Sequence, residues 1–314
     1  MANRVGTDQF RFFAFSNQMS AVRYILAQEY GAGRGQLPAL SNVIEGRPAF
    51  LKMQRRSHAR PARLAALITN AWQTELTLNL PRLVTHDQLS VLTIQWGIVQ
   101  LYFSIHSAAS AWLEAMCGPT APASHAAFLR TLEDHVSKGT FPLPWGAACR
   151  SCSPLSPSGE IAGHHFTAPD LQDRPCYADA RDFLCAALRW AREGQLAESV
   201  DRWKRDHGRS RISRAKKAEL DGKLRETTVF DFLYQLRRRA NYADAGFFME
   251  GVRHPGEAAR FHVALSRINA ASLLLFEKLL CATHGKRTMT ELAESFVGRS
   301  DFARRLVGSR VDLW

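Results

Sequence analysis

The sequence predicts an all-α protein, an antiparallel helix bundle with an irregular proline-rich insertion. Apolar residues recur at helical spacing over several long segments, and strand patterns are sparse. Six prolines fall between residues 139 and 178, in a stretch also rich in Gly and Ser. With 314 residues and 46% hydrophobic composition, the chain can bury a sizeable core, which excludes disulfide-stapled miniproteins and low-complexity disorder.

Helical patterns follow one another along the chain, and turn residues separate them. They cover residues 62–80, 89–117, 121–136, 178–207, 210–242 and 256–283. Pro81 is expected to end the first, Gly118 the second and Gly285 the last, and Ser124 is a typical N-cap. We therefore predict an N-terminal appendage (1–61), a bundle (62–285) whose insertion at 139–178 lacks regular structure, and a C-terminal helical appendage (286–314).

The charge balance favours a polyanionic partner. Lys and Arg total 41 against 29 for Asp and Glu, which gives a net charge of +12, carried mostly by arginine. Guanidinium groups suit bidentate phosphate contacts, although a coding preference for arginine gives the same composition. The apolar run at 91–115 is interrupted by polar residues such as Gln100 and Glu114, so it predicts a buried helix and no membrane span. The N-terminus lacks a secretory pattern, and a cytoplasmic location is expected.

The segment DFLYQLRRRANYADAGFF at 231–248 is the most informative for function. On a helix, Arg237 and Asn241 share a face, as do Arg238 and Tyr242. Three consecutive arginines, Arg237 to Arg239, beside an amide and a phenol could hold a phosphate and orient a ribose hydroxyl. The alternative is a solvated turn, with Tyr242 as an interfacial aromatic residue.

The order of three segments resembles the HEPN superfamily of small helical bundle proteins. These are WGIVQLYFSIHSAASAWLEAMCG, SHAAFLRTLEDHV and LYQLRRRANYADAGFF, and the resemblance covers roughly residues 62–283. In that superfamily a late helix carries an Arg-x(4–6)-His ribonuclease motif or a variant such as Arg-x-x-Ala-Asp-Tyr. Arg237 or Arg238 stands at the arginine position, with Asn241 and Tyr242 at the polar and aromatic positions. No His follows in this helix.

The resemblance implies an RNA-binding protein or metal-independent endoribonuclease of a stress or antiviral defence system, with its site at a homodimer interface. Arg237 would stabilise the pentavalent phosphate, and the base would be His106, a neighbouring His or Tyr242. His106 has a second interpretation, as a core histidine hydrogen-bonded within the bundle. The missing His leaves open a catalytically inactive scaffold subunit of a protein or nucleoprotein complex.

The insertion contains a possible structural zinc site. Cys149 and Cys152 are separated by two residues, and His164 and Cys176 could complete a tetrahedral ligand set. The alternative is free thiols and surface histidines. Together with a tail at 288–310 that could form a helix-turn-helix, a zinc site would favour a DNA-binding regulator. No other cofactor is expected.

Overall fold

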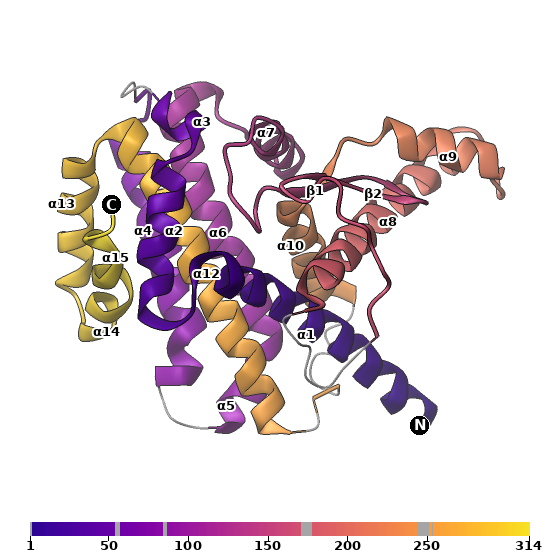
Figure 1. Ribbon diagram of the computed structural model, residues 1–314, viewed down its shortest axis with the longest axis horizontal. Coiled ribbons are helices and arrows are strands. Elements are labelled where there is room, and N and C mark those ends of the chain that lie inside the picture. The colour runs from indigo at the N-terminus through magenta and orange to yellow at the C-terminus, as the bar shows by residue number, and fades with distance from the viewer. Residues whose placement is uncertain (1, 54–56, 84–86, 171–177, 244–250, 253) are drawn as a thin grey trace.

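The chain folds around one largely buried helix, α6 (Ile94–Cys117), of whose 24 residues 16 are buried. The computed structural model describes residues 2–53, 57–83, 87–170, 178–243, 251–252 and 254–314. Helices α4 (Pro61–Leu83) and α12 (Pro255–His284) make the most extensive contacts with α6 (Figure 1). Helix α1 (Ala2–Tyr30) packs against α12 and against α8 (Ala180–Asp206). The predicted all-α fold is confirmed.

Shorter helices complete the bundle. They are α2 (Gln36–Glu45), α3 (Pro48–Leu51), α5 (Asp87–Leu92), α7 (His125–Ser137), α9 (Arg214–Lys223), α10 (Val229–Arg238), α13 (Lys286–Val297), α14 (Asp301–Ala303) and α15 (Ser309–Val311). Two π-helical turns, η3 (Arg239–Ala243) and η4 (Arg304–Gly308), follow α10 and α14. Within the described ranges, every helix is too short or too polar along its length to span a bilayer.

Three helix boundaries differ from the prediction, each for a local reason. The expected helix at 89–117 is interrupted at Thr93, whose hydroxyl donates to the Leu89 carbonyl at 2.5 Å, a back-bond that bends helices. Helix α4 continues through Pro81, because a proline in the last turn removes only one hydrogen bond near the helix end. The pattern at 210–242 divides into α9 and α10, because Thr228 caps a new helix.

Part of the insertion is regular, which makes the prediction of an irregular 139–178 segment wrong there. Strands β1 (Ala147–Cys152) and β2 (Leu155–Gly159) form a hairpin, and β3 (Thr227–Thr228) pairs with β1, in the antiparallel order β2-β1-β3. These strands are rich in Ala, Ser and Cys, residues with little strand preference. Their pairing is a tertiary effect, organised by the buried Arg192 of α8. Its guanidinium donates to Asp221 Oδ1 at 2.7 Å and to the Arg225 carbonyl at 2.9 Å, next to β3.

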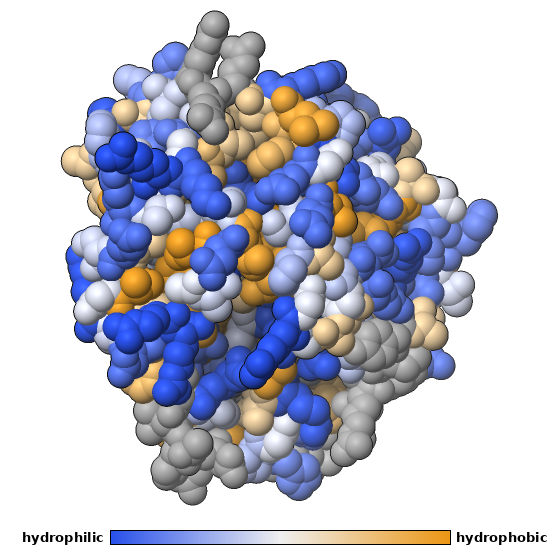
Figure 2. Space-filling view, turned by 60° about the vertical axis from the view of Figure 1, so that its left-hand side comes forward, coloured by the Kyte–Doolittle hydropathy of each residue, from blue (hydrophilic) through white to orange (hydrophobic). Residues whose placement is uncertain are grey.

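Both terminal segments belong to the same hydrophobic core as the bundle. Phe12 and Ile25 of α1 and Leu40 of α2 are buried in it, and so are Met289 of α13 and Val307 of η4. The face of the molecule that includes α13 to α15 is mostly hydrophilic, with apolar residues in small groups between polar ones (Figure 2).

A buried ionic network attaches α15 to the bundle. Arg310 donates two hydrogen bonds to Glu75 of α4, at 2.7 and 2.8 Å, and two to Glu277 of α12, both at 2.9 Å. The indole N–H groups of Trp72 and Trp314 also donate to Glu277, at 2.8 and 3.1 Å. All three charged side chains are at most 1% exposed. The guanidinium of Arg310 is fully hydrogen-bonded in this network, so its loss leaves two buried carboxylates without the cation between them.

We therefore expect Arg310→Met to lower the free energy of unfolding by about 3–5 kcal/mol, because it removes the cation that pairs with both Glu75 and Glu277. Urea denaturation followed by circular dichroism measures the change. Arg304→Met is the matched control, because Arg304 is 68% exposed and pairs only with exposed Asp301; it should cost less than about 1 kcal/mol. Equal losses of unfolding free energy in the two variants would show that the buried network stabilises the fold no more than an exposed ion pair does.

Candidate functional site

Helix α10, which carries the predicted arginines, begins at a well-defined point. Thr228 and Asp231 form a capping box, in which the Thr228 N–H donates to Asp231 Oδ2 at 2.9 Å. The buried Asp231 also accepts a hydrogen bond from Gln195 of α8 at 2.9 Å and forms an ion pair with Arg225. Because these contacts fix the start of α10 against α8, they also fix the position of its last turn against α6.

Arg237 occupies that last turn and is buried, with 7% of its surface exposed. Its guanidinium carbon lies 5.3 Å from the ring centroid of Tyr102, 5.1 Å from that of Phe103 and 5.5 Å from that of Tyr234. Nε is enclosed and has no hydrogen-bond partner, and within the described residues no carboxylate pairs with this side chain. The interpretation of 237–239 as a solvated turn is therefore wrong for Arg237. Aromatic faces attract a cation but only partly replace an anion.

Two histidines lie next to the arginine and its rings. His106 is on α6, one turn after Tyr102, and His125 is the first residue of α7, next to the N-cap Ser124. The two imidazole centroids are 4.9 Å apart, and the Tyr102 hydroxyl is 2.9 Å from His125 Nδ1. We name Tyr102, His106, His125, Tyr234 and Arg237 the Arg–His–Tyr cluster.

Burial sets the protonation states within the cluster. Burial, together with the neighbouring His125 and Arg237, lowers the pKa of His106 to about 4. Burial and Arg237 also lower the pKa of His125, whereas burial raises that of Tyr102. At neutral pH both imidazoles are therefore neutral and the phenol is protonated. The positive charge of the cluster at that pH is the guanidinium of Arg237.

The cluster has access to solvent through pockets on two faces of α7. His106 and His125 line one of about 370 Å³, together with Ser110 and Arg63. Tyr234 lines another of about 420 Å³. Arginines also line this second pocket: Arg130, Arg202, Arg225 and Arg238. The first pocket thus borders the two histidines and the second borders Tyr234, whereas Arg237 is not among the lining residues of either.

The three predicted nucleic-acid-binding arginines point to different neighbours. Arg237 faces α6, whereas Arg238 forms an ion pair with Glu198 of α8. The guanidinium of Arg239 lies 5.7 Å from the ring centroid of Trp190, also on α8. Successive residues of a helix are about 100° apart, so three in a row cannot share one face. The guanidinium of Arg238 also lies 5.7 Å from the ring centroid of Tyr234, but of the three arginines Arg237 alone contacts Tyr102 as well.

Asn241 and Tyr242 lie in η3, where the helix widens. A π-helical turn takes one more residue than an α-helical turn, so the shared face predicted for Arg237 and Asn241 does not continue through it. Gln95 of α6 donates to the Ala240 carbonyl at 2.7 Å and fixes this turn. Asn241 is half-buried, and the side chain of Tyr242 lies outside the described residues.

The structure shows members of the cluster that the sequence interpretation missed. It named His106 and a neighbouring His, but it did not identify His125, Tyr102 or Tyr234. The sequence contained a signal for two of them: Tyr102 precedes His106 by four residues, and His125 follows an N-cap. His106 is not the hydrogen-bonded core histidine of the alternative interpretation, because within the described residues it makes ring contacts only, to Tyr102, His125 and Phe128.

The predicted zinc ligands are only partly visible. Cys149 and Cys152 lie on β1, where Cys149 is buried in the main core. His164 Nε2 is 3.0 Å from Asp182 Oδ1, and Cys176 lies outside the described residues. Within the described part of the chain, no three His, Cys, Asp or Glu side chains are grouped so as to hold a metal ion. The zinc site stays a prediction.

Comparisons with known proteins give no relative: no family model, no curated protein and no solved structure matches this chain. The resemblance to the HEPN superfamily therefore stays a prediction from the three segments quoted above. Functional interpretation rests on the geometry and electrostatics of the cluster itself.

Replacing Arg237 should raise the pKa values of the two cluster histidines. In Arg237→Gln the positive charge that disfavours both imidazolium ions is gone, so the pKa values of His106 and His125 move upward. A pH titration of the histidine ring signals by NMR measures both. Arg238→Gln removes the same charge one residue away and should leave both values unchanged. A shift of equal size in the two variants would contradict the assigned geometry.

Proposed function

We propose that this protein binds RNA at the Arg–His–Tyr cluster and cleaves it as a metal-independent endoribonuclease. The observation that carries the proposal is the buried Arg237 without an anionic partner in the described residues. The other two buried arginines of that part of the chain, Arg192 and Arg310, each form ion pairs with carboxylates. Because a buried cation is stable only when it is paired, a phosphate group is the anion that would complete the site.

The surrounding charges support a nucleic-acid ligand. The chain carries a net charge of +12, and four arginines line the pocket next to Tyr234. In that pocket Arg225 already pairs with Asp231, and Arg238 with Glu198. The guanidinium groups of Arg130 and Arg202 are left for a backbone phosphate. Arginine suits this role because its fork of N–H donors matches two phosphate oxygens.

The cluster contains the groups for transesterification of RNA. Neutral His106 would accept the proton of a 2′-hydroxyl, whose oxygen then attacks the adjacent phosphorus. Arg237 would stabilise the pentavalent phosphate as the bond between phosphorus and the 5′-oxygen breaks. The bound phosphate raises the pKa of His125, and the protonated His125, oriented through its contact with Tyr102, would protonate the 5′-oxygen. The products are a 2′,3′-cyclic phosphate and a 5′-hydroxyl.

A catalytically inactive scaffold subunit is the second candidate. It is favoured by the absence of a His after Arg237 in α10 and by the 7% exposure of Arg237, which restricts access to the phosphate site. In this case the protein would bind RNA or a nucleoprotein complex through the same arginine and leave the strand intact. A homodimeric assembly, a cytoplasmic location and a role in stress or antiviral defence come from the sequence interpretation, and we retain them as proposals.

The two candidates are distinguished by cleavage of an end-labelled RNA oligonucleotide in the presence of EDTA. We expect the wild-type protein to produce 2′,3′-cyclic phosphate ends and to leave DNA of the same sequence intact, because DNA lacks the 2′-hydroxyl. Arg237→Gln, His106→Gln and His125→Gln should each lower the cleavage rate on the order of 100-fold or more, as expected for loss of a charge-stabilising or proton-transfer group.

Matched variants serve as controls. His165→Gln and Arg205→Gln make the same changes at exposed positions and should retain wild-type cleavage. Circular dichroism verifies that each variant is folded. Cleavage that is unaffected by all three cluster variants contradicts the enzyme proposal. RNA binding that depends on Arg237 without any cleavage supports the scaffold candidate, and absence of RNA binding contradicts the enzyme proposal and any RNA contact of the scaffold candidate.

A further inference from the structure

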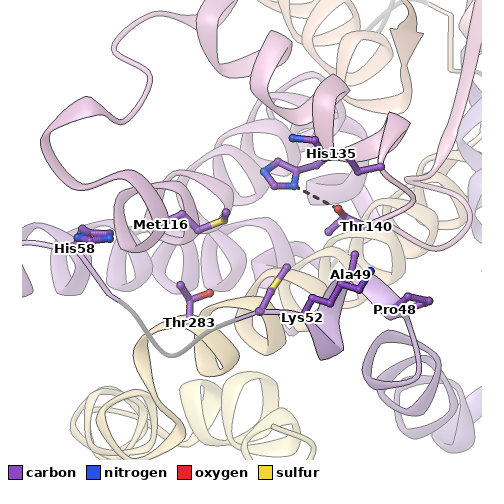
Figure 3. Close-up of a pocket in the computed structure, with 10 residues that line it drawn as sticks. Pro48, Ala49, Lys52, His58, Met116, His135, Thr140 and Thr283 are labelled. Carbon is purple, nitrogen blue, oxygen red and sulfur yellow. Dashed lines mark hydrogen bonds between the residues drawn. The ribbon is translucent and has the colours of Figure 1, made fainter.

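A third pocket, of about 550 Å³, lies away from the Arg–His–Tyr cluster, where the ends of several helices meet. Lys138 and Thr140 follow α7, Met116 lies at the end of α6, and Thr283 at the end of α12. The remaining lining residues come from α3 and the segment after it: Pro48, Ala49, Lys52, Met53 and His58. His135 of α7 completes the lining, and Figure 3 shows these side chains around the pocket.

The lining of this pocket is basic. Lys52 and Lys138 contribute two ammonium groups, and within the described residues neither forms an ion pair. His58 and His135 add two imidazoles, while none of the lining residues is acidic. Other lysines of the chain do have acidic partners: Lys216 and Lys223 pair with Glu219, and Lys278 pairs with Glu45. An unneutralised pair of ammonium groups at one pocket favours an anionic ligand.

The deeper part of the pocket combines polar and apolar groups. Thr140 is 3% exposed and Thr283 is 4% exposed. His135 Nδ1 is 3.3 Å from the Thr140 hydroxyl, which leaves Nε2 for a ligand (Figure 3). The ring of His135 packs on Trp112 with 4.6 Å between centroids, so its orientation is fixed. Met53 and Met116 add flexible, polarizable side chains that adapt to an apolar or flat group.

From this arrangement we infer that the pocket binds a small organic phosphate, a phosphate monoester attached to a flat or apolar group of nucleoside size. Lys52 and Lys138 bind the phosphate, His135 Nε2 contributes a hydrogen bond, and the methionines contact the organic group. The volume is within the range of pockets that enclose ligands of this size. Lysine is well suited because an ammonium group acts as a point charge toward phosphate oxygens. This function is separate from RNA cleavage and does not depend on it.

The test uses adenosine 5′-monophosphate as the probe, with adenosine and inorganic phosphate as comparison ligands, followed by calorimetry and by NMR of the histidine rings. We expect the nucleotide to bind at least about tenfold more tightly than either comparison ligand. Adenosine lacks the phosphate group that the lysines bind, and inorganic phosphate lacks the organic group that the methionines contact. Binding of the phosphate next to His135 should also raise the pKa of its imidazole, which burial and Lys138 hold near 4 in the free protein.

Charge-neutral variants locate the site. Lys52→Gln and Lys138→Gln should each weaken nucleotide binding about tenfold, whereas Lys217→Gln on α9 should leave it unchanged. All three lysines are exposed, so the variants are expected to fold. Absence of nucleotide binding overturns the inference, and so does equal binding of adenosine or of inorganic phosphate. Binding that is insensitive to both pocket lysines places the ligand elsewhere and also overturns it.

Discussion

The arrangement of the molecule depends on the burial of α6. A helix with two thirds of its residues removed from solvent must be covered on nearly every side, and α4, α12, α7 and α10 provide that cover. Polar side chains on such a helix must find partners within the protein. Ser104 donates to the Ala71 carbonyl at 3.0 Å, and Glu114 pairs with Arg60 and Arg63. Tyr102 meets His125 for the same reason, and this contact forms the centre of the Arg–His–Tyr cluster.

Buried arginines have two different roles in this fold. Arg192 and Arg310 each connect several elements through hydrogen bonds to carboxylates and to backbone carbonyls. Arg237 is surrounded by aromatic rings and has an enclosed Nε without a partner. The first two stabilise the fold by complete pairing. The third carries an electrostatic cost that an anionic ligand would relieve, which is why it has the strongest functional interpretation of the three.

The protonation states follow from the same burial. Desolvation keeps His106 and His125 neutral and Tyr102 protonated, so the site combines one fixed cation with two proton acceptors. Binding of an anion would raise the pKa values of the two histidines and favour their imidazolium forms. Substrate binding would therefore be coupled to proton transfer. In the basic pocket beside α3, burial likewise lowers the pKa of His135, but the cations that line this pocket are lysines, whose ammonium groups are point charges on flexible stems.

The sequence by itself determined most of the helices after residue 60, because apolar spacing, N-caps such as Ser124 and helix-ending residues such as Gly285 act within a few residues of the chain. It did not predict the helices α1 and α2. It also singled out Arg237 and His106 as individual candidates. Only the tertiary structure decided that these two residues lie together with His125 and Tyr102, and that Arg238 and Arg239 do not join them. It likewise decided that residues 147–159 form a hairpin. The spacing of apolar residues in the sequence indicates which face of its own helix a residue occupies. Which other element packs against that face depends on contacts between segments that are distant in the chain.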